Sequence, residues 1–258
     1  KYGLMINQGI WITSGPGFSS NAPYRESQKK QILQTVQKYK KYPALLLWNI
    51  GNENIENLNT KKDKEAFCKF LEDTVKEIHK IDPFHPVAYT GVCGNPLKLL
   101  KAYTPSLDIY GVNAYAGIKN FRRKWKGSAI QIPYLFSEYG PNGPWEVKKD
   151  KHSQPEEASD AEKARLYKQR WEHYIKRFKG TCLGGYAFLL ESKDEGTKTW
   201  WGITYEALRK EAFWALYRLY TDKEPRNLPA KIKSFHISPS ANVRGGRKIH
   251  IRIIADDP

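Results

Sequence analysis

The sequence predicts an α/β protein built on a (β/α)8 barrel. Short apolar runs alternate with helical patterns along the first 221 residues, which is typical of a parallel sheet with crossover helices. Three strand–helix units of about 28 residues fit in the 85 residues that separate Glu53 from Glu138, close to the roughly 30 that each barrel unit needs. No glycine-rich phosphate loop opens a helix, which disfavours the alternative, a doubly wound open sheet.

The clearest predicted strand is the apolar run Leu45–Ile50, which lies between Pro43 and Gly51. A short run without alternation indicates a strand that is buried on both faces, as in a parallel sheet. Five other apolar runs predict strands for the same reason. They lie at about 3–12, 86–91, 107–113, 133–137 and 183–190.

Helices are expected between these strands, since apolar residues recur there at three- and four-residue spacing. The second helix follows Thr60, whose spacing to Asp63 resembles a capping box, and Asp82–Pro83 ends it. Pro43 follows the end of the first helix. The first helix is expected at about 27–42. The helices after the second are expected at about 96–103, 119–126, 157–178 and 205–220.

Six strand–helix units are two short of a closed barrel, and an open barrel would leave two exposed edges. We therefore expect the chain to lack the first two units, residue 1 to lie in the second helix, and the chain alone to be inactive. After residue 221 the sequence becomes rich in proline and lysine, and then alternates as strands do. One hairpin is too little to fold alone. We expect a barrel domain at 1–221, followed at 222–258 by a linker and the start of a β-sandwich.

The net charge of +16 raises the question of an acidic partner such as nucleic acid. The basic residues are scattered, however, in short groups such as Lys61–Lys62, Arg122–Lys124 and Lys148–Lys149. No arginine-rich helix or zinc-finger spacing is present. These features favour a solvated basic surface and no nucleic-acid role, with a polyanion-binding protein left as an alternative.

Three cysteines without CxxC spacing disfavour a disulfide framework or a structural zinc site. Cys68 and Cys182 lie on apolar stretches and are expected in the core. No three ligands share metal-site spacing, so we expect no metal and no other cofactor. No run is long enough to span a membrane, and no signal peptide is visible. The location is left open, secreted and periplasmic included, as is the oligomeric state.

Two carboxylates, Glu53 and Glu138, each end an apolar strand. Charged residues at the ends of buried strands need a partner or a task; the alternative is that both are structural and are satisfied by arginine or backbone groups. In a barrel, the carboxyl ends of the strands form the active-site face. Glycoside hydrolysis needs two carboxyl groups, roughly 5–5.5 Å apart in retaining enzymes, and their proximity raises the pKa of the proton donor.

The segment Trp48–Glu53 resembles the acid/base motif of glycoside hydrolase clan A, and Phe136–Gly140 resembles its nucleophile motif. Both are similar to motifs of glycoside hydrolase family 2 catalytic domains and of family 72 β-1,3-glucanosyltransferases, over about residues 1–220. The resemblance implies that Glu53 is the general acid/base and Glu138 the nucleophile.

The same resemblance implies roles for residues around the pair. Asn52 would bind the sugar 2-hydroxyl, and Tyr115 would be the sixth-strand tyrosine that hydrogen-bonds the nucleophile, with a rim aromatic as the alternative. Asn113 is expected to reach the site as well. Many clan members end the eighth strand with a tryptophan under the sugar, which the segment Tyr186–Glu191 lacks. Loop residues could replace it, and the candidates are Trp145, Trp200 and Trp201.

We therefore expect a retaining glycoside hydrolase or transglycosidase that cleaves β-glycosidic bonds in a polysaccharide or oligosaccharide by double displacement. A non-catalytic carbohydrate-binding barrel is the first alternative, suggested by the missing tryptophan. A basic polyanion-binding protein is the second. The sugar, the linkage and the choice between hydrolysis and transfer stay open.

Overall fold

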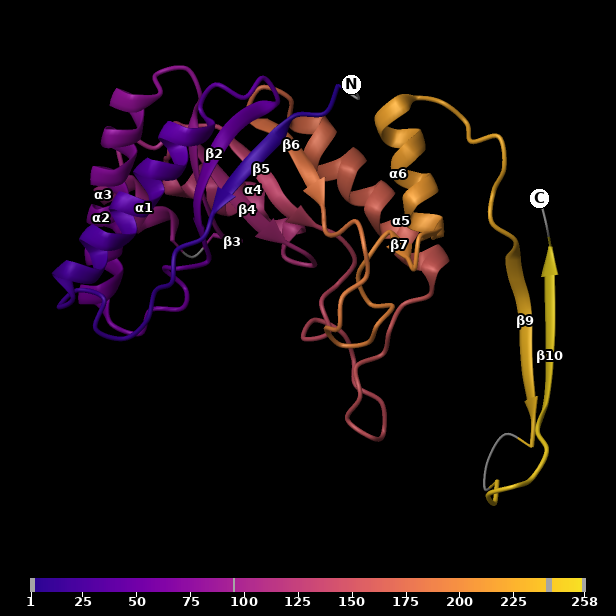
Figure 1. Cartoon of the computed structure of the whole chain (residues 1–258). Coiled ribbons are helices and arrows are strands. Elements are labelled where there is room, and N and C mark those ends of the chain that lie inside the picture. The colour runs from indigo at the N-terminus through magenta and orange to yellow at the C-terminus, as the bar shows by residue number, and fades with distance from the viewer. Residues whose placement is uncertain (1–2, 95, 240–242, 257–258) are drawn as a thin grey trace.

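The computed structural model describes residues 3–94, 96–239 and 243–256. Six parallel strands form one sheet in which each strand pairs with the next along the chain, as the alternation of strands and helices predicts. The sheet is curled and open, with β1 at one edge and β6 at the other (Figure 1). Its strands are β1 (Ile6–Ile10), β2 (Leu45–Asn52), β3 (Val87–Val92), β4 (Ile109–Ala114), β5 (Tyr134–Tyr139) and β6 (Cys182–Ala187).

Helices on the outer side of the curl connect the strands (Figure 1). They pack against one another in chain order, α1 against α2 and α2 against α3, while α5 packs against α6. Among the residues that the structure describes, no helix combines the length and hydropathy that crossing a membrane requires. The helices are α1 (Ala22–Tyr39), α2 (Lys61–Ile81), α3 (Leu97–Tyr103), α4 (Ile118–Ser128), α5 (Asp160–Arg170) and α6 (Glu211–Thr221).

Two apolar clusters hold the sheet. The larger one fills the space between strands and helices and contains Cys68 and Cys182, as the sequence predicts. The smaller one lies within the sheet and consists of Leu47, Ala88, Ile109 and Leu135. It borders a cavity of about 430 Å³, and Leu46 beside it is 42% exposed. The expected burial of the Glu53 strand on both faces is therefore wrong at Leu46.

Three helix boundaries differ from the prediction. α1 begins five residues early, because Asn21 caps it by accepting a hydrogen bond from the Tyr24 amide. α5 leaves α-helical geometry after Arg170 and continues as a π turn and a 3₁₀ turn to Phe178. α6 begins only at Glu211, because β7 (Thr204–Tyr205) and β8 (Leu208–Arg209) form a small hairpin before it.

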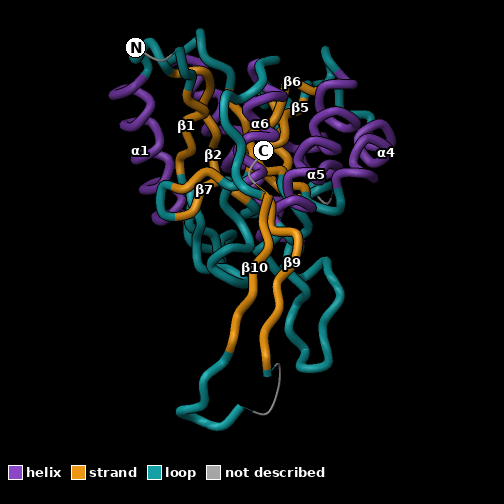
Figure 2. The backbone as a smooth tube through the Cα atoms, turned by 90° about the vertical axis from the view of Figure 1, so that its right-hand side faces the viewer, coloured by secondary structure: helices purple, strands orange, loops and turns teal. Residues whose placement is uncertain are grey.

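A separate antiparallel hairpin, β9 (Lys231–Ser238) with β10 (His250–Asp256), follows α6. It stands apart from the six-stranded sheet (Figure 1), and in the view turned by 90° it lies in front of the other elements (Figure 2). Apolar side chains such as Phe235 and Ile253 are about half exposed, at 54% each. The expected strand pair is present. Residues 240–242 between the two strands lie outside the described residues.

A buried carboxylate fixes the helical side of β2. Asp82, at the end of α2, accepts a hydrogen bond from the Trp48 indole at 2.9 Å and pairs with His85 Nδ1 at 2.8 Å. Burial of Asp82 opposes its ionisation, but the hydrogen bonds from Trp48 and His85 outweigh burial and lower its pKa below the ordinary 3.8. His85 thus has a structural role in this arrangement.

Replacing Asp82 with alanine should lower the free energy of unfolding by about 3 kcal/mol at pH 7, because the Trp48 and His85 groups lose a buried partner. A carboxylate with a lowered pKa stabilises the fold above its unfolded pKa, and this contribution is lost as pH falls through the folded value. The difference between variant and wild type should therefore shrink below about pH 4. Urea unfolding measures both effects. Asp73→Ala, at an exposed position of the same helix, is the control, and an equal loss there would contradict the account.

Candidate active site

A tight turn at the end of β2 presents Asn52 and Glu53. Gly51 has a φ of +80° and Glu53 a φ of +53°. The buried Asn54 holds the turn: its Oδ1 accepts a hydrogen bond from the Asn52 amide at 3.0 Å, and its Nδ2 donates to the Ile12 carbonyl at 2.7 Å. A Cβ at Gly51 would lie 2.3 Å from Asn54 Oδ1. Glycine is therefore required at 51 for this arrangement.

Asn113, at the end of β4, connects the two carboxylate strands. Its Nδ2 donates to Glu53 Oε1 at 2.8 Å and to Asn52 Oδ1 at 3.1 Å. Its Oδ1 accepts from Ser137 Oγ at 2.9 Å, next to Glu138 on β5. Asn113 is only 5% exposed, and its Cα pairs with that of Glu138 in the sheet register. One amide thus links the ends of three strands.

Glu138 receives its hydrogen bond from Tyr115, whose hydroxyl donates to Glu138 Oε2 at 2.6 Å. Burial raises the pKa of the Glu138 carboxyl; the Tyr115 hydrogen bond lowers it, and the nearby Glu53 charge raises it again. The net result is a raised pKa. Burial and the Glu138 charge raise the pKa of Tyr115 as well, so its hydroxyl stays protonated and remains a donor.

In the structure a raised pKa belongs to Glu138, the residue expected to act ionised. The physical cause is that burial of Glu138 outweighs its hydrogen bond. Lys193 supplies a positive charge that lowers the same pKa, and Glu195 a negative charge that raises it.

A cavity of about 730 Å³ lies at this rim of the sheet. It brings together most of the site residues that the sequence predicts, and it adds side chains that the motifs do not indicate. The predicted residues on its wall are Asn52, Glu53, Asn113, Tyr115, Glu138 and Trp145. The additional ones include Trp11, Lys124, Glu146, Phe188, Lys193 and Glu195.

The three candidate tryptophans have different surroundings. Trp145 is 62% exposed and lines the cavity. Trp201 is 1% exposed and packs on Tyr115, with ring centroids 4.7 Å apart. Trp200 is 2% exposed, and its indole donates to the Asn142 carbonyl at 2.9 Å. The structure therefore keeps Trp200 and Trp201 out of the cavity wall. Phe188, just after β6, lines the cavity together with Trp145.

Buried charges hold the loops behind Tyr115. Lys163 and Lys210, both less than a tenth exposed, donate to the Thr199 carbonyl at 2.8 and 2.9 Å, directly before the Trp pair. Glu146 accepts hydrogen bonds from the amides of Ala116 and Gly143, both at 2.9 Å. It thereby joins the segment after Tyr115 to the loop that carries Trp145. Loops fixed by so many partners present the cavity as a preformed site.

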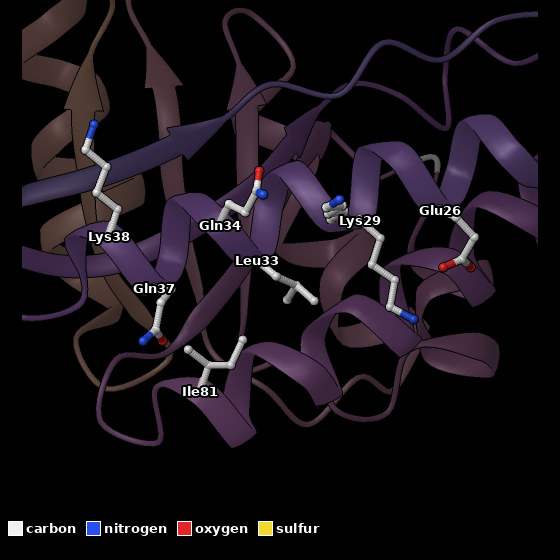
Figure 3. Close-up of a pocket in the computed structure, with 8 residues that line it drawn as sticks. Glu26, Lys29, Leu33, Gln34, Gln37, Lys38 and Ile81 are labelled. Carbon is white, nitrogen blue, oxygen red and sulfur yellow. The ribbon is translucent and has the colours of Figure 1, made fainter.

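Another cavity, of about 620 Å³, lies on the outer side of α1 (Figure 3). It runs along the helix between lysine and glutamine side chains, with Leu33 and Ile81 at its base. Neither Glu53 nor Glu138 lines it. No group of three or more His, Cys, Asp or Glu side chains placed to hold a metal ion occurs within residues 3–94, 96–239 and 243–256.

Comparison with known proteins gives the family. A family model described as the TIM barrel domain of glycosyl hydrolases family 2 matches residues 8–179. The chain belongs to glycoside hydrolase family 2. Of the two families that the motifs resemble, this match supports family 2 and gives no support to family 72. No curated protein matches this family 2 chain in sequence.

Solved structures share the fold of this family 2 chain. A GH2 β-galacturonidase from Eisenbergiella tayi bound to galacturonate is 14% identical, with a TM-score of 0.62 over 85% of this chain and 41% of that one. Bacteroides uniformis β-glucuronidase 2, covalently bound to cyclophellitol-6-carboxylate aziridine, is 15% identical, with a TM-score of 0.65 over 90% and 30%. An endo-1,4-β-xylanase from Caldicellulosiruptor owensensis is 15% identical, with a TM-score of 0.54 over 75% and 68%. The chain spans less than half the length of the family 2 galacturonidase.

Removing the Tyr115 hydroxyl as Tyr115→Phe should lower kcat/KM by about 10–100-fold, the value of one hydrogen bond to a charged group. Four neighbouring groups shift the pKa of the Glu138 carboxyl, namely Tyr115, Glu53, Lys193 and Glu195. Because the Tyr115 bond lowers the pKa of Glu138, its loss should move the acidic limb of the kcat/KM profile to higher pH. The measurement is a pH profile on an aryl β-glycoside in the full-length protein. Tyr42→Phe, at a 59% exposed position, is the control, and an unshifted acidic limb in Tyr115→Phe would contradict this role.

Proposed function

We propose that this domain carries the catalytic centre of a retaining β-glycosidase or transglycosidase, with Glu138 as nucleophile and Glu53 as general acid/base. The observation that carries the proposal is the hydrogen-bonded arrangement across β2, β4 and β5. Tyr115 bonds one oxygen of Glu138, and Asn113 bonds one oxygen of Glu53, on the wall of one cavity. Family membership supports the same chemistry.

The first step forms a glycosyl ester. Tyr115 occupies Oε2 of Glu138, which leaves Oε1 to attack the anomeric carbon. As that bond forms, the bond to the leaving oxygen breaks, and Glu53 gives this oxygen its proton. Asn52 would bind the sugar 2-hydroxyl, and this contact strengthens in the transition state. Since Asn113 bonds both Asn52 and Glu53, it would align the sugar contact with the proton donor.

The second step releases the sugar. Glu53, now ionised, removes a proton from water or from an acceptor hydroxyl, whose oxygen attacks the anomeric carbon. The ester bond to Glu138 breaks, and both carboxyl groups return to their starting states. Two inversions retain the configuration. Water as the acceptor gives hydrolysis, and a sugar hydroxyl gives transglycosylation of an oligosaccharide or polysaccharide.

Phe188, Trp145 and Trp11 offer aromatic surfaces to the sugar, because all three line the cavity. Trp200 and Trp201 are proposed to act indirectly, through the packing of Trp201 on Tyr115. We also propose that residues 222–258 belong to a separate β-rich unit, since β9 and β10 pair only with each other among the described strands.

Glu138→Gln should lower kcat on aryl β-glycosides by more than about 10⁴-fold in the full-length protein, because an amide cannot form the ester. Release of the aryl group measures the loss. Glu26→Gln, on the outer cavity of α1 (Figure 3), makes the same chemical change away from the site and should leave kcat unaltered. Wild-type turnover in Glu138→Gln would refute the assignment. Oligosaccharide binding without turnover in the wild type would favour a non-catalytic binding barrel.

Glu53→Gln separates the acid/base role from the nucleophile role. A dinitrophenyl leaving group needs little protonation, so the glycosyl ester should still form. Its hydrolysis should be slow because the variant lacks the base that activates water, and kcat should be lower by about 10²–10⁴-fold. Azide needs no deprotonation and should restore turnover, giving a β-glycosyl azide. Product analysis by NMR identifies the anomer. Failure of azide to rescue Glu53→Gln, or an α-azide as product, would exclude this role for Glu53.

A further inference from the structure

The cavity has a charge balance opposite to that of the whole chain. Among the residues that the structure describes, the wall carries the carboxyl groups of Glu53, Glu138, Glu146 and Glu195 and two ammonium groups, those of Lys124 and Lys193. The chain itself has a net charge of +16. The negative groups are therefore concentrated where substrate would bind.

Both of these ammonium groups already have partners within the protein. Lys193 forms an ion pair with Glu195 and lies 5.2 Å from the centroid of the Phe188 ring. Lys124 donates to the Cys93 carbonyl at 3.1 Å, and its stem packs so closely on Gly94 that a Cβ there would lie 2.5 Å from it. A carboxylate on a bound sugar would have to displace one of these partners.

We propose that the Lys193–Glu195 ion pair makes this site selective for neutral β-glycosides over β-uronides. This inference rests on the proposed glycosidase function and specifies its substrate class. A uronide brings a C6 carboxylate into a cavity that already holds four glutamate side chains, of which only Glu53 carries a proton in the first step of the proposed reaction. If that carboxylate formed an ion pair with Lys193, Glu195 would lose its partner near the nucleophile. If it did not, the carboxylate of the uronide would itself have no partner. Like charges at close range in a partly buried site repel each other strongly.

The ion pair lies within electrostatic reach of Glu138, since both of its charges act on the pKa of that carboxyl in opposite directions. The side chains of Lys193 and Glu195 are 46% and 35% exposed. A pair this exposed contributes little to stability, so its replacement should leave the fold intact. The loop that carries it also supplies matched controls, Asp194 and Lys198, which are exposed and do not line the cavity.

The test measures kcat/KM of the full-length protein on three pairs of aryl β-glycosides, and the members of each pair differ only at C6. The pairs are glucoside and glucuronide, galactoside and galacturonide, and mannoside and mannuronide. Wild type should favour the neutral member by at least about tenfold in kcat/KM. Glu195→Gln frees Lys193 and should move this ratio about tenfold toward the uronide, and Lys193→Met should move it further toward the neutral sugar. Asp194→Asn and Lys198→Met make the same charge changes outside the cavity and should stay within about twofold of wild type. High salt should reduce the effect of Glu195→Gln.

A wild type that prefers the uronide overturns the inference, as does an equal ratio in Glu195→Gln and Asp194→Asn. If turnover in either case still depends on Glu138, the proposed glycosidase function stands and only the selectivity is refuted. Absence of turnover on all six substrates would refute both.

Discussion

The candidate site depends on one constraint: a carboxylate in a largely buried position must be able to ionise. Burial raises the pKa of Glu138, and the Tyr115 hydroxyl supplies the hydrogen bond that opposes this effect. Tyr115 can do so only if its ring is fixed. Trp201 packs on that ring, and the carbonyls on either side of Trp200 accept hydrogen bonds from the buried Lys210. The loops behind the site therefore hold in place the hydroxyl group that opposes the effect of burial on Glu138.

A second set of contacts fixes Glu53 relative to Glu138. The turn after β2 exists because Gly51 accepts a positive φ and Asn54 satisfies the backbone groups around it. Asn113 then connects Glu53 with the strand that carries Glu138 through Ser137. The backbone turn at Gly51 and the side-chain amide of Asn113 thus both position Glu53 at the same rim of the sheet. Both depend on the parallel order of β2 to β5, which sets the three strand ends side by side.

Much of this could be predicted from the sequence, because strand burial leaves a local signal. The six apolar runs predicted the six strands, and the polar ends of two of them predicted the rim with Glu53 and Glu138. The loop residues left no such signal. Phe188, Lys193 and Glu195 line the cavity although they lie in an irregular segment after β6. Trp200 and Trp201, further along the same segment, are buried. The start of α6 was missed for a similar reason: residues 204–209 form a hairpin that contacts the segment after β6.

The most direct test of the account is trapping of the glycosyl-enzyme. A 2-deoxy-2-fluoro β-glycoside with a good leaving group slows both steps but slows release more, so the ester accumulates. Peptide mapping by mass spectrometry of the treated full-length protein should find one glycosyl group, attached to Glu138, and its appearance should coincide with loss of turnover. A protein that still turns over its substrate while the label lies on another residue, or while no label forms, would contradict the account.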